Sequence, residues 1–443
     1  MTRSGFLTDI LSSIFERGEA RLSGRDDRPI EALCAALLSG EGEASGTRIA
    51  AALLERYGEL DAAGKHAFFE TLCEQYDIDT GAVLADAEAY ARSRDSGDLA
   101  RLLHDAEPRR QELLRRLNRA QGATGALVRM RADLLDFLAQ TPSFRRVDLD
   151  FDHLFASWFN RGFLVLRRID WATPANILEK IIEYEAVHAI DDWDDLRRRL
   201  APPDRRCFGF FHPSMPDEPL IFVEVALTKD IPDSIQALLL EEREQVSEDE
   251  ATTAVFYSIS NCQRGLAGVS FGNFLIKQVA VDLSQSLPNL KTFVTLSPVP
   301  GFSRWLAGQA EQDGEETHPA ADAIARLLAG ADRLEENGEL LGRLAAEYLC
   351  LAKRRDGRPV DPVARFHLGN GARLERINPG GDVSPKGIAA SCGVMVNYLY
   401  DLKTVETNHE AYARNGEVIA SRAIRALLHA KPPRGYQRRS ENA

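Results

Sequence analysis

Residues 253–277 read TAVFYSISNCQRGLAGVSFGNFLIK: a β-rich run, a glycine-rich turn and the start of an apolar helix. Gly265, Gly268 and Gly272 permit unusual backbone angles, which can aim successive N–H groups at one point. The helix expected from about Asn273 would add the positive end of its dipole there. A strand, a glycine turn and a helix in this order favour a phosphate-binding loop in an α/β domain. A turn that binds no ligand is the plain alternative.

The same turn also fits the pattern G-x-S-x-G at residues 268–272, which is the nucleophile elbow of serine hydrolases. Asp361 and His367 follow Ser270 in the chain order that such enzymes use for their acid and histidine. An elbow, however, requires the strand to run directly into the serine, and residues 261–267 intervene here. We therefore favour the phosphate loop, and we keep a hydrolase built on Ser270 as an alternative. Arg264, just before the loop, supplies local positive charge to the favoured reading.

Composition suits a globular protein of two domains, because 443 residues can bury a large core and 44% of them are hydrophobic. The net charge of −13 opposes binding to nucleic acid and to anionic membranes, so we expect neither as a partner. The sequence contains no run of about eighteen apolar residues of the kind that spans a membrane.

The six cysteines are widely spaced and include no C-x-x-C pair, which favours reduced thiols in a cytoplasmic protein. The nine histidines show no H-x-x-x-H spacing, so we expect no metal site. The first 22 residues, MTRSGFLTDILSSIFERGEARL, are amphipathic and carry acids early, which is typical of a folded helix rather than a targeting peptide.

Hydrophobic periodicity divides the chain into two parts. Residues 1–160 carry apolar side chains at three- and four-residue spacing and predict an all-helical domain. Residues 161–443 predict a mixed α/β domain, because helical stretches there alternate with β-rich runs. Those runs are GFLVLRRI (162–169), CFGFFHP (207–213), LIFVEVALT (220–228), TAVFYSIS (253–260) and KTFVTLSP (291–298).

Three further segments have simple interpretations. The basic stretch RRQELLRRLNR (109–119) keeps a helical leucine stripe, which predicts a solvated helix face rather than a nucleic-acid site. The stretch GEETHPAADAIARLLAG (314–330) has the composition of a mobile insertion. The last helix is expected in EVIASRAIRALLHA, before Lys431-Pro432-Pro433 and a frayed tail.

Several stretches of the second part resemble malonyl-CoA decarboxylases, in chain order over most of residues 160–402. They are EPLIFVEVALTKDIP (218–232), SISNCQRGLAGVSFGNFLIK (258–277), TFVTLSPVPGFSRWL (292–306), ARFHLGNGARLERIN (364–378) and SCGVMVNYLYDL (391–402). The strand, turn and helix around Gly268 are also similar to the coenzyme A loop of the N-acetyltransferase superfamily, with imperfect spacing to its Q/R-x-x-G-x-G/A signature.

The resemblance implies an α + α/β protein with two domains. Residues 1–160 would be a helical oligomerisation domain, giving a homodimer or homotetramer. Residues 161–443 would be a catalytic domain of acetyltransferase-like (GNAT-type) fold that converts malonyl-CoA to acetyl-CoA and CO₂. No separate cofactor is implied, because coenzyme A is part of the substrate. The residues implied to hold its pyrophosphate are Ala267, Gly268, Val269, Ser270, Phe271, Gly272 and Asn273.

Ser270 departs from the family pattern, because some relatives carry an acid at that position. A neutral serine there should not weaken phosphate binding. Any role of that acid is therefore not transferred to this chain.

Loss of CO₂ from a malonyl thioester sets three tasks for the protein. The carboxylate must be held so that the breaking bond lies perpendicular to the thioester plane. The charge on the thioester oxygen must be stabilised, and the α-carbon must then be protonated. The thioester is itself the electron sink, so the reaction requires neither a metal nor pyridoxal.

Ser297 ends a predicted strand in Leu296-Ser297-Pro298-Val299-Pro300-Gly301, where the two prolines restrict the loop. The resemblance implies that it is the catalytic serine, a role often described as proton acceptor. We favour positioning of the leaving carboxylate, because the sequence shows no base beside Ser297 and an unassisted serine is a poor base. A simple turn at a strand end is the alternative.

His367, in Arg365-Phe366-His367-Leu368, is the candidate proton donor, because an imidazole ordinarily titrates near neutral pH. The resemblance implies that Tyr400 lines the acyl pocket and bonds His367 or the thioester, with a packed core tyrosine as the alternative. Asn397 would be its neighbour if that segment were helical. Arg365 is a candidate to orient a carboxylate, or is simply exposed.

His212 also matches the family pattern, and we expect it to cap a strand end rather than to take part in catalysis. Three alternatives to the decarboxylase remain open: an acyl-CoA-dependent N-acyltransferase on the same fold, a thioesterase or other hydrolase using Ser270, and a non-catalytic acyl-CoA sensor. The resemblance also leaves open whether the pathway is malonate breakdown or the control of fatty-acid synthesis.

Overall fold

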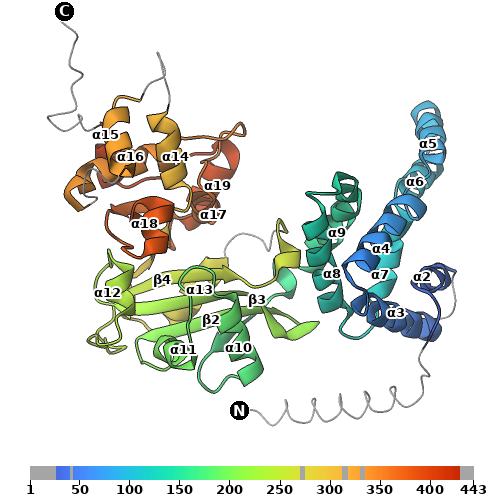
Figure 1. Ribbon diagram of the computed structural model, residues 1–443, viewed down its shortest axis with the longest axis horizontal. Coiled ribbons are helices and arrows are strands. Elements are labelled where there is room, and N and C mark those ends of the chain that lie inside the picture. Colours follow the sequence, from blue (N-terminus) through green and yellow to red (C-terminus); the bar gives the residue numbers. More distant parts are fainter. Residues whose placement is uncertain (1–25, 40–42, 270–274, 312–317, 330–334, 430–443) are drawn as a thin grey trace, which may run out of the picture. The chain divides into compact units, whose positions relative to one another are not determined.

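The computed structural model describes residues 26–39, 43–269, 275–311, 318–329 and 335–429 (Figure 1). The chain divides into two compact units. The helical unit comprises residues 1–163 together with 213–215 and 263–270. The sheet unit comprises residues 164–212, 216–262 and 271–443. The amphipathic N-terminal stretch of residues 1–22 and the tail after His429 lie outside the described residues.

The helical unit contains eight described α-helices, and polar caps mark where several of them begin. Asp61, Asp79 and Asp95 each accept a hydrogen bond from a backbone N–H in the first turn of the helix that follows. The helices are α2 (Ile30–Leu38), α3 (Glu43–Gly58), α4 (Ala62–Gln75), α5 (Thr80–Ser93), α6 (Ser96–Asp105), α7 (Arg109–Leu117), α8 (Ala123–Phe137) and α9 (Arg145–Trp158), with 3₁₀ turns η1 (Pro142–Phe144), η2 (Arg161–Phe163) and η3 (Arg264–Leu266).

Helix α7 confirms the leucine stripe, and Arg110 is an exception to the solvated face predicted around it. Leu113, Leu114 and Leu117 are buried. Arg110 is also buried, and its guanidinium pairs with Asp77 at 2.8 Å and with Asp150. The two carboxylates compensate for the loss of water around the charge.

The sheet unit is built on an eight-stranded sheet with the order β1-β2-β3-β4-β5-β8-β6, in which β7 also pairs with β8. The strands are β1 (Val165–Ile169), β2 (Arg205–His212), β3 (Met215–Thr228), β4 (Thr253–Asn261), β5 (Thr292–Thr295), β6 (Ser297–Pro298), β7 (Arg373–Asn378) and β8 (Met395–Leu399). Strands β4 and β5 are parallel and are joined through helix α13, whereas β3–β4 and β5–β8 are antiparallel. This mixed α/β sheet, which follows a helical N-terminal part, confirms the α + α/β fold class predicted from the sequence.

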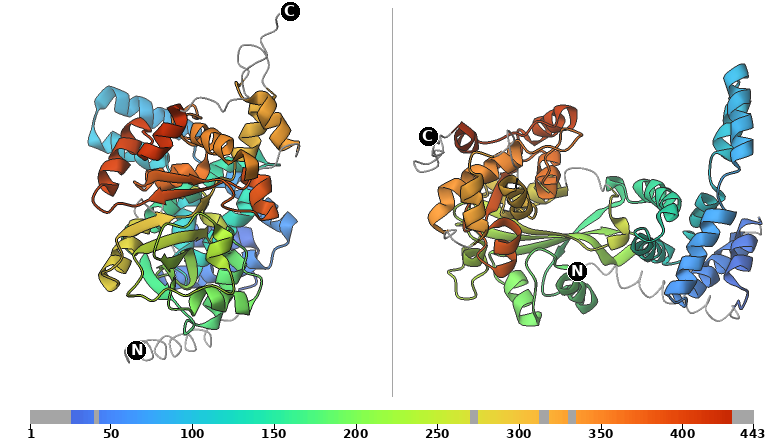
Figure 2. Two further views of the ribbon diagram at one scale, coloured as in Figure 1. Left: turned by 90° about the vertical axis from the view of Figure 1, so that its left-hand side faces the viewer. Right: turned by 45° about the horizontal axis from the view of Figure 1, so that its top comes forward.

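Helices cover both faces of this sheet (Figure 1; Figure 2, right). On one face, α13, α14, α15, α16, α17 and α20 contribute to the largest hydrophobic cluster, and on the other face α10, α11 and α12 bury smaller ones. The helices are α10 (Ala175–Tyr184), α11 (Trp193–Leu200), α12 (Ile235–Leu239), α13 (Leu275–Ser286), α14 (Phe302–Ala310), α15 (Ala321–Leu328), α16 (Gly338–Cys350), α17 (Pro362–Gly369), α18 (Pro385–Ser391), α19 (Val405–Asn415) and α20 (Arg422–His429), with the 3₁₀ turn η5 (Glu335–Asn337).

Three sequence-based expectations for the sheet unit are wrong in detail. Residues 395–399 form strand β8 and not a helix, so Asn397 and Tyr400 are not helical neighbours. Residues 321–328 of the expected mobile insertion form α15, whose Ile324 is fully buried in the core. The last helix begins at Arg422, several residues later than expected, because Ala420 bridges to Leu374 of β7.

Two further observations concern the chain as a whole. All six cysteines lie among the described residues, and each is a free thiol. Among the described helices, none combines the length and the apolar character needed to cross a membrane.

Candidate active site

Ser297, His367 and Tyr400 meet in the interior of the sheet unit, although 70 and 33 positions separate them along the chain. The Nε2 atom of His367 lies 3.1 Å from Ser297 Oγ. Its Nδ1 atom lies 2.8 Å from the hydroxyl oxygen of Tyr400. Both ring nitrogens of the histidine therefore have a hydroxyl partner.

Three strands position the two hydroxyl groups. Ser297 begins β6 and pairs with Val396 of β8. Tyr400 follows β8 directly, and its backbone N–H bonds the carbonyl of Phe293 in β5 at 2.8 Å. The ladder between these short strands thus brings the serine and the tyrosine to one place in the sheet.

His367 lies in helix α17, which begins at a proline after a capping aspartate. The Asp361 carboxylate accepts the N–H of Ala364 at 2.7 Å, and Pro362 occupies the first turn, where its missing N–H costs nothing. The His367 ring stacks on Tyr398 of β8 with centroids 4.6 Å apart. This stack fixes the ring plane, so the two nitrogens point at their hydroxyl partners.

Burial decides the protonation states at this site. The exposed fractions of Ser297, His367 and Tyr400 are 5%, 2% and 1%. Burial lowers the pKa of His367 to about 3 and raises the pKa of Tyr400 well above its usual value. The expectation that His367 titrates near neutral pH is therefore wrong for the substrate-free protein, in which the ring is neutral.

The structure also corrects the premise that Ser297 has no base beside it, because His367 lies within hydrogen-bonding distance. Sequence reasoning missed a second neighbour, Thr295. Ser297 Oγ donates to Thr295 Oγ1 at 2.8 Å, and the backbone N–H of Tyr398 donates to the same oxygen at 3.1 Å. The spacing of two residues along a strand places Thr295 and Ser297 on one face, which is the signal that would have found it.

Asn397 holds this region together without contacting His367. Its Nδ2 donates to the carbonyl of Thr295 at 2.8 Å, and its Oδ1 accepts from Arg376 and Asn378. It is therefore a buried cross-strand amide that ties β8 to the end of β5.

Asp361 does not complete a hydrolase triad. Its carboxylate bonds Ala364 and the hydroxyl of Tyr348, and both nitrogens of His367 are already taken by Ser297 and Tyr400. Burial raises the pKa of Asp361 to about 6. Its role is that of a helix cap, which weakens the hydrolase alternative.

Two other candidates also have structural roles. His212 is the last residue of β2, as expected for a strand end. The guanidinium of Arg365 donates to the carbonyls of Pro359 and Val360. The sequence left open either a carboxylate partner or an exposed side chain.

Only part of the predicted phosphate loop can be placed. Ala267, Gly268 and Val269 are described, whereas Ser270, Phe271, Gly272 and Asn273 lie outside the described residues. Gly268 has a φ of +82°, which agrees with the prediction of an unusual backbone angle.

Gly265 has a different role from the one predicted. Its φ is not positive, and its importance lies in close packing: a Cβ atom there would lie 1.8 Å from the carbonyl oxygen of Val128 in α8. Arg131 of α8 donates to the carbonyl of Gly265 at 3.1 Å and to Asp148 at 2.9 Å. The described part of the loop is thus anchored on the helical unit.

Arg264 is also committed to the helical unit. Its guanidinium forms a two-pronged pair with the Asp136 carboxylate at 2.8 and 2.7 Å. The expected local positive charge is therefore largely neutralised by an acid in α8.

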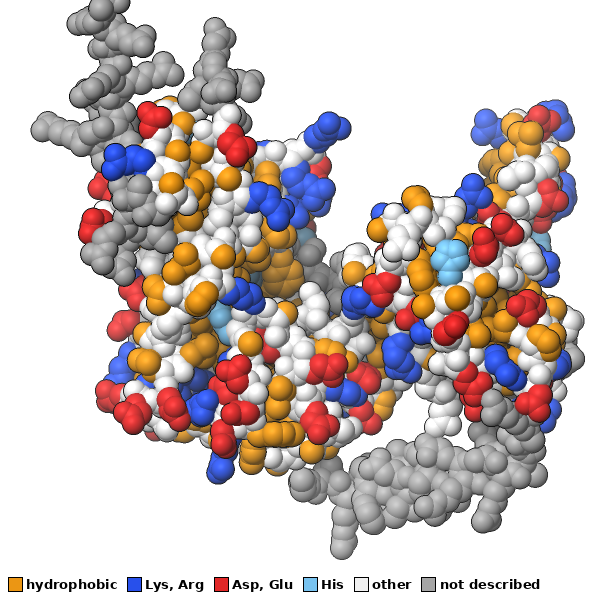
Figure 3. Space-filling model, viewed as in Figure 1, with side chains coloured by type: hydrophobic (Ala, Val, Ile, Leu, Met, Phe, Trp, Pro, Cys, Tyr) orange, Lys and Arg blue, Asp and Glu red, His pale blue; other side chains and the backbone are white. Residues whose placement is uncertain are grey.

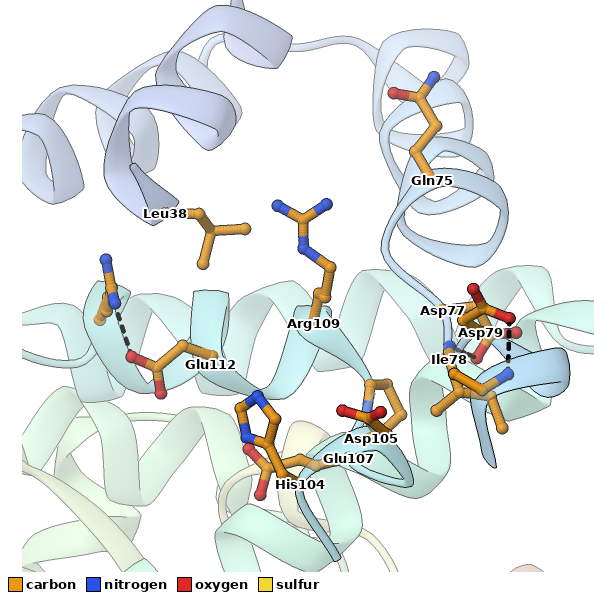
Figure 4. A pocket seen from close by; sticks show the side chains of 13 residues that line it. Leu38, Gln75, Asp77, Ile78, Asp79, His104, Asp105, Glu107, Arg109 and Glu112 are labelled. Atoms are coloured by element: carbon orange, nitrogen blue, oxygen red, sulfur yellow. Dashed lines mark hydrogen bonds and ion pairs between the residues drawn. The ribbon is translucent and has the colours of Figure 1, made fainter. Parts of the chain in front are cut away.

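A pocket of about 810 Å³ lies within the helical unit and is lined by α2, α4, α5, α6 and α7 (Figure 4). Five acidic residues line it, together with two arginines and one histidine: Asp77, Asp79, Asp105, Glu107 and Glu112 against Arg109, Arg116 and His104. An acidic lining repels an anionic ligand, so this pocket does not suit coenzyme A, and it includes no member of the Ser297 site.

Comparison with known proteins places this site in a family. The family described as malonyl-CoA decarboxylase C-terminal domain matches residues 162–438, and the one described as malonyl-CoA decarboxylase N-terminal domain matches residues 76–159. A curated relative, the mitochondrial malonyl-CoA decarboxylase of Rattus norvegicus, is 36% identical over 84% of this chain and 83% of its own. The mitochondrial enzyme of the same name from Anser anser anser is 35% identical over 94% of this chain and 90% of its own.

Solved structures agree. The crystal structure of malonyl-CoA decarboxylase from Rhodopseudomonas palustris is 55% identical, covers 90% of this chain and 98% of its own, and superimposes with a TM-score of 0.85. That from Agrobacterium vitis is 52% identical, covers 91% of this chain and all of its own, with a TM-score of 0.82. With both domain families matched in order and each of these relatives covered over at least 83% of its length, the chain belongs to the malonyl-CoA decarboxylase family.

Proposed function

We infer that this chain converts malonyl-CoA to acetyl-CoA and CO₂. The observation that carries the inference is the buried series of hydrogen-bonded side chains Ser297, His367 and Tyr400 in a protein of this family. It offers a hydroxyl for the carboxylate and a histidine N–H for the α-carbon, without a second substrate. The thioester is the electron sink, so we propose that the reaction needs no separate cofactor.

The proposed steps balance in atoms and charge. The bond from the α-carbon to the carboxylate carbon breaks, CO₂ leaves, and the electron pair passes into the thioester as an enolate. His367 Nε2 gives its proton to the α-carbon, and Tyr400 gives its hydroxyl proton to Nδ1. Water then returns a proton to Nε2, and the Nδ1 proton passes back to the Tyr400 oxygen, which restores the starting state. An enolate carbon is a strong base, so a neutral imidazole N–H supported by Tyr400 suffices as the acid.

Ser297 is proposed to hold the leaving carboxylate. A neutral hydroxyl can orient a carboxylate without the strong attraction of a cation, which would oppose the loss of CO₂. Arg376 does not replace this hydroxyl as the carboxylate partner, because its guanidinium already donates to Asn397 and to the carbonyls of Ile231 and Pro232. We further propose that Ala267–Asn273 bind the pyrophosphate through backbone N–H groups.

Incubation of the protein with malonyl-CoA alone tests the function. We expect acetyl-CoA and CO₂ in equal amounts with no acceptor present. An N-acyltransferase would require an amine before any coenzyme A appeared. A Ser270 hydrolase would release free coenzyme A and would lose activity in Ser270→Ala, whereas we expect Ser270→Ala to keep CO₂ release. An acyl-CoA sensor would bind without turnover. Any of those three results would contradict the proposal.

We propose that residues 1–160 mediate self-association and that residues 161–443 form the catalytic domain. Helices α5 and α6 support this, because they pack together and neither contains a buried residue. Leu84 and Leu103 on them are 63% and 65% exposed. Figure 3 shows hydrophobic side chains among charged ones on this hairpin. A second copy of the hairpin is the proposed partner.

Sedimentation velocity tests this partner. We expect Leu84→Asp combined with Leu103→Asp to lower the oligomer mass, because a buried carboxylate is costly at an interface. The matched control carries Arg92→Asp on the same hairpin, at a side chain already 73% exposed. An unchanged mass in the double variant would contradict a role of this hairpin. We also propose a cytoplasmic location, in line with six reduced cysteines, which fractionation of cells would check.

A further inference from the structure

The hydrogen bonds around His367 form one continuous chain, and its direction decides what the histidine can do. The chain runs through Tyr400, His367, Ser297 and Thr295. Two arrangements of hydrogens run every one of these bonds in the same direction. In one, Tyr400 donates to Nδ1, Nε2–H donates to Ser297, and Ser297 donates to Thr295. In the other, every one of these bonds is reversed.

The two arrangements correspond to two kinds of chemistry. In the reversed arrangement, Ser297 donates its hydrogen to Nε2, which is how a histidine base activates a serine nucleophile for acyl transfer. In the first arrangement, the histidine shows an N–H at Nε2 and acts as a proton donor. A neutral His367 carries a single ring hydrogen, so it can adopt only one arrangement at a time.

Thr295 determines the direction of the last hydrogen bond in this series. Ser297 Oγ is the donor and Thr295 Oγ1 the acceptor in the 2.8 Å bond between them. The backbone N–H of Tyr398, which can only donate, fills a second position on the same oxygen at 3.1 Å. Thr295 is fully buried, and Asn397 holds its carbonyl at 2.8 Å, so the hydroxyl is presented from a fixed backbone.

We propose that Thr295 is a positioning residue that draws the Ser297 hydrogen away from His367, so that Nε2 carries the proton needed by the enolate. When substrate arrives, the Ser297 hydroxyl exchanges Thr295 for a carboxylate oxygen. In both states its hydrogen points away from Nε2, and the histidine remains a donor. Thr295 acts through Ser297 and forms no bond to substrate. The proposal rests on the proposed decarboxylation and names what keeps this site from acting as an acyl-transfer site.

The test compares Thr295→Val with Thr295→Ser in the full-length protein. Valine keeps the shape of threonine and removes the acceptor, whereas serine keeps it. We expect Thr295→Val to lower the turnover number at least about 10-fold with little change in KM, and Thr295→Ser to restore it. Thr292→Val, three residues earlier on β5, is the matched control and should match the unchanged protein.

A second readout needs no substrate. Nitrogen-15 NMR of labelled histidine distinguishes a ring protonated at Nε2 from one protonated at Nδ1. We expect Nε2–H in the unchanged protein and in Thr295→Ser, and Nδ1–H in Thr295→Val. An Nε2–H ring in a folded Thr295→Val variant would overturn the proposal, and so would loss of turnover in both Thr295 variants. If the unchanged protein released no CO₂, the proposed function would be wrong. The NMR result would still test whether Thr295 determines which nitrogen of His367 is protonated.

Discussion

His367→Gln is expected to lower the turnover number for CO₂ release from malonyl-CoA by about 10³-fold, within the range of general acid–base catalysis. Glutamine keeps a polar side chain of similar reach but cannot relay a proton from Tyr400. Because His367 is buried among Ser297, Tyr398 and Tyr400, the loss should fall on turnover, and KM should stay close to its original value. Steady-state kinetics with a CO₂ assay measure both.

The matched control is His104→Gln, because His104 lies exposed on α6 in the helical unit. It should leave both constants unchanged. Ser297→Ala should also show a deep loss of turnover with retained affinity for coenzyme A. Wild-type turnover in His367→Gln would show that another group supplies the proton.

The pH dependence of the same reaction distinguishes a His367 that stays neutral from one that titrates near neutral pH. Burial lowers its pKa to about 3, so the ring stays neutral as pH rises through 6.5, where an ordinary histidine loses its proton. We therefore expect kcat/KM of the unchanged protein to vary less than about twofold between pH 6 and 8. An ionisation near pH 6.5 that disappears in His367→Gln would contradict a neutral donor.

The second large effect is expected from Gly265→Ala. The added Cβ would lie 1.8 Å from the carbonyl oxygen of Val128 and 2.7 Å from its carbonyl carbon, and neither backbone atom can move aside cheaply. The turn must therefore leave α8 and break its bond to Arg131. We expect the free energy of unfolding to fall by about 3 kcal/mol or more, and the KM for malonyl-CoA to rise because the adjoining loop is displaced.

Alanine substitutions at two other glycines distinguish the effect of steric overlap from that of backbone strain. Gly268→Ala meets no atom within 4 Å but must keep a φ of +82°, so it should cost about 1–2 kcal/mol. Gly46→Ala, in helix α3 of the same unit, also meets nothing within 4 Å and should be neutral or slightly stabilising. Urea unfolding followed by circular dichroism measures all three. A Gly265→Ala variant as stable as Gly46→Ala would show that the turn does not pack on α8 in this way.

Much of the fold follows from local signals, and the misses have physical causes. The β-rich runs in β1 to β5 are continuous enough to be read from the sequence. The segment RLERIN of β7 carries no clear strand pattern, because only Leu374 and its last residues are buried. The segment MVNYL of β8 is compatible with a helix as well as a strand, because it is buried along almost its whole length and has no period of two. The burial of Arg110 depends on Asp77 and Asp150, which no local pattern near α7 reveals.

The sequence by itself determined the two-part organisation, the glycine turn before a helix and the family, because these rest on short-range periodicity and on contiguous stretches such as LSPVPGF and RFHLGNGA. It also named Ser297, His367 and Tyr400, by resemblance. Only the tertiary structure decided that these side chains meet, that burial keeps His367 neutral, and that Thr295 faces Ser297. Those properties depend on the removal of water and on hydrogen-bond directions between β5, β6, β8 and α17, and the chain order of residues does not encode either.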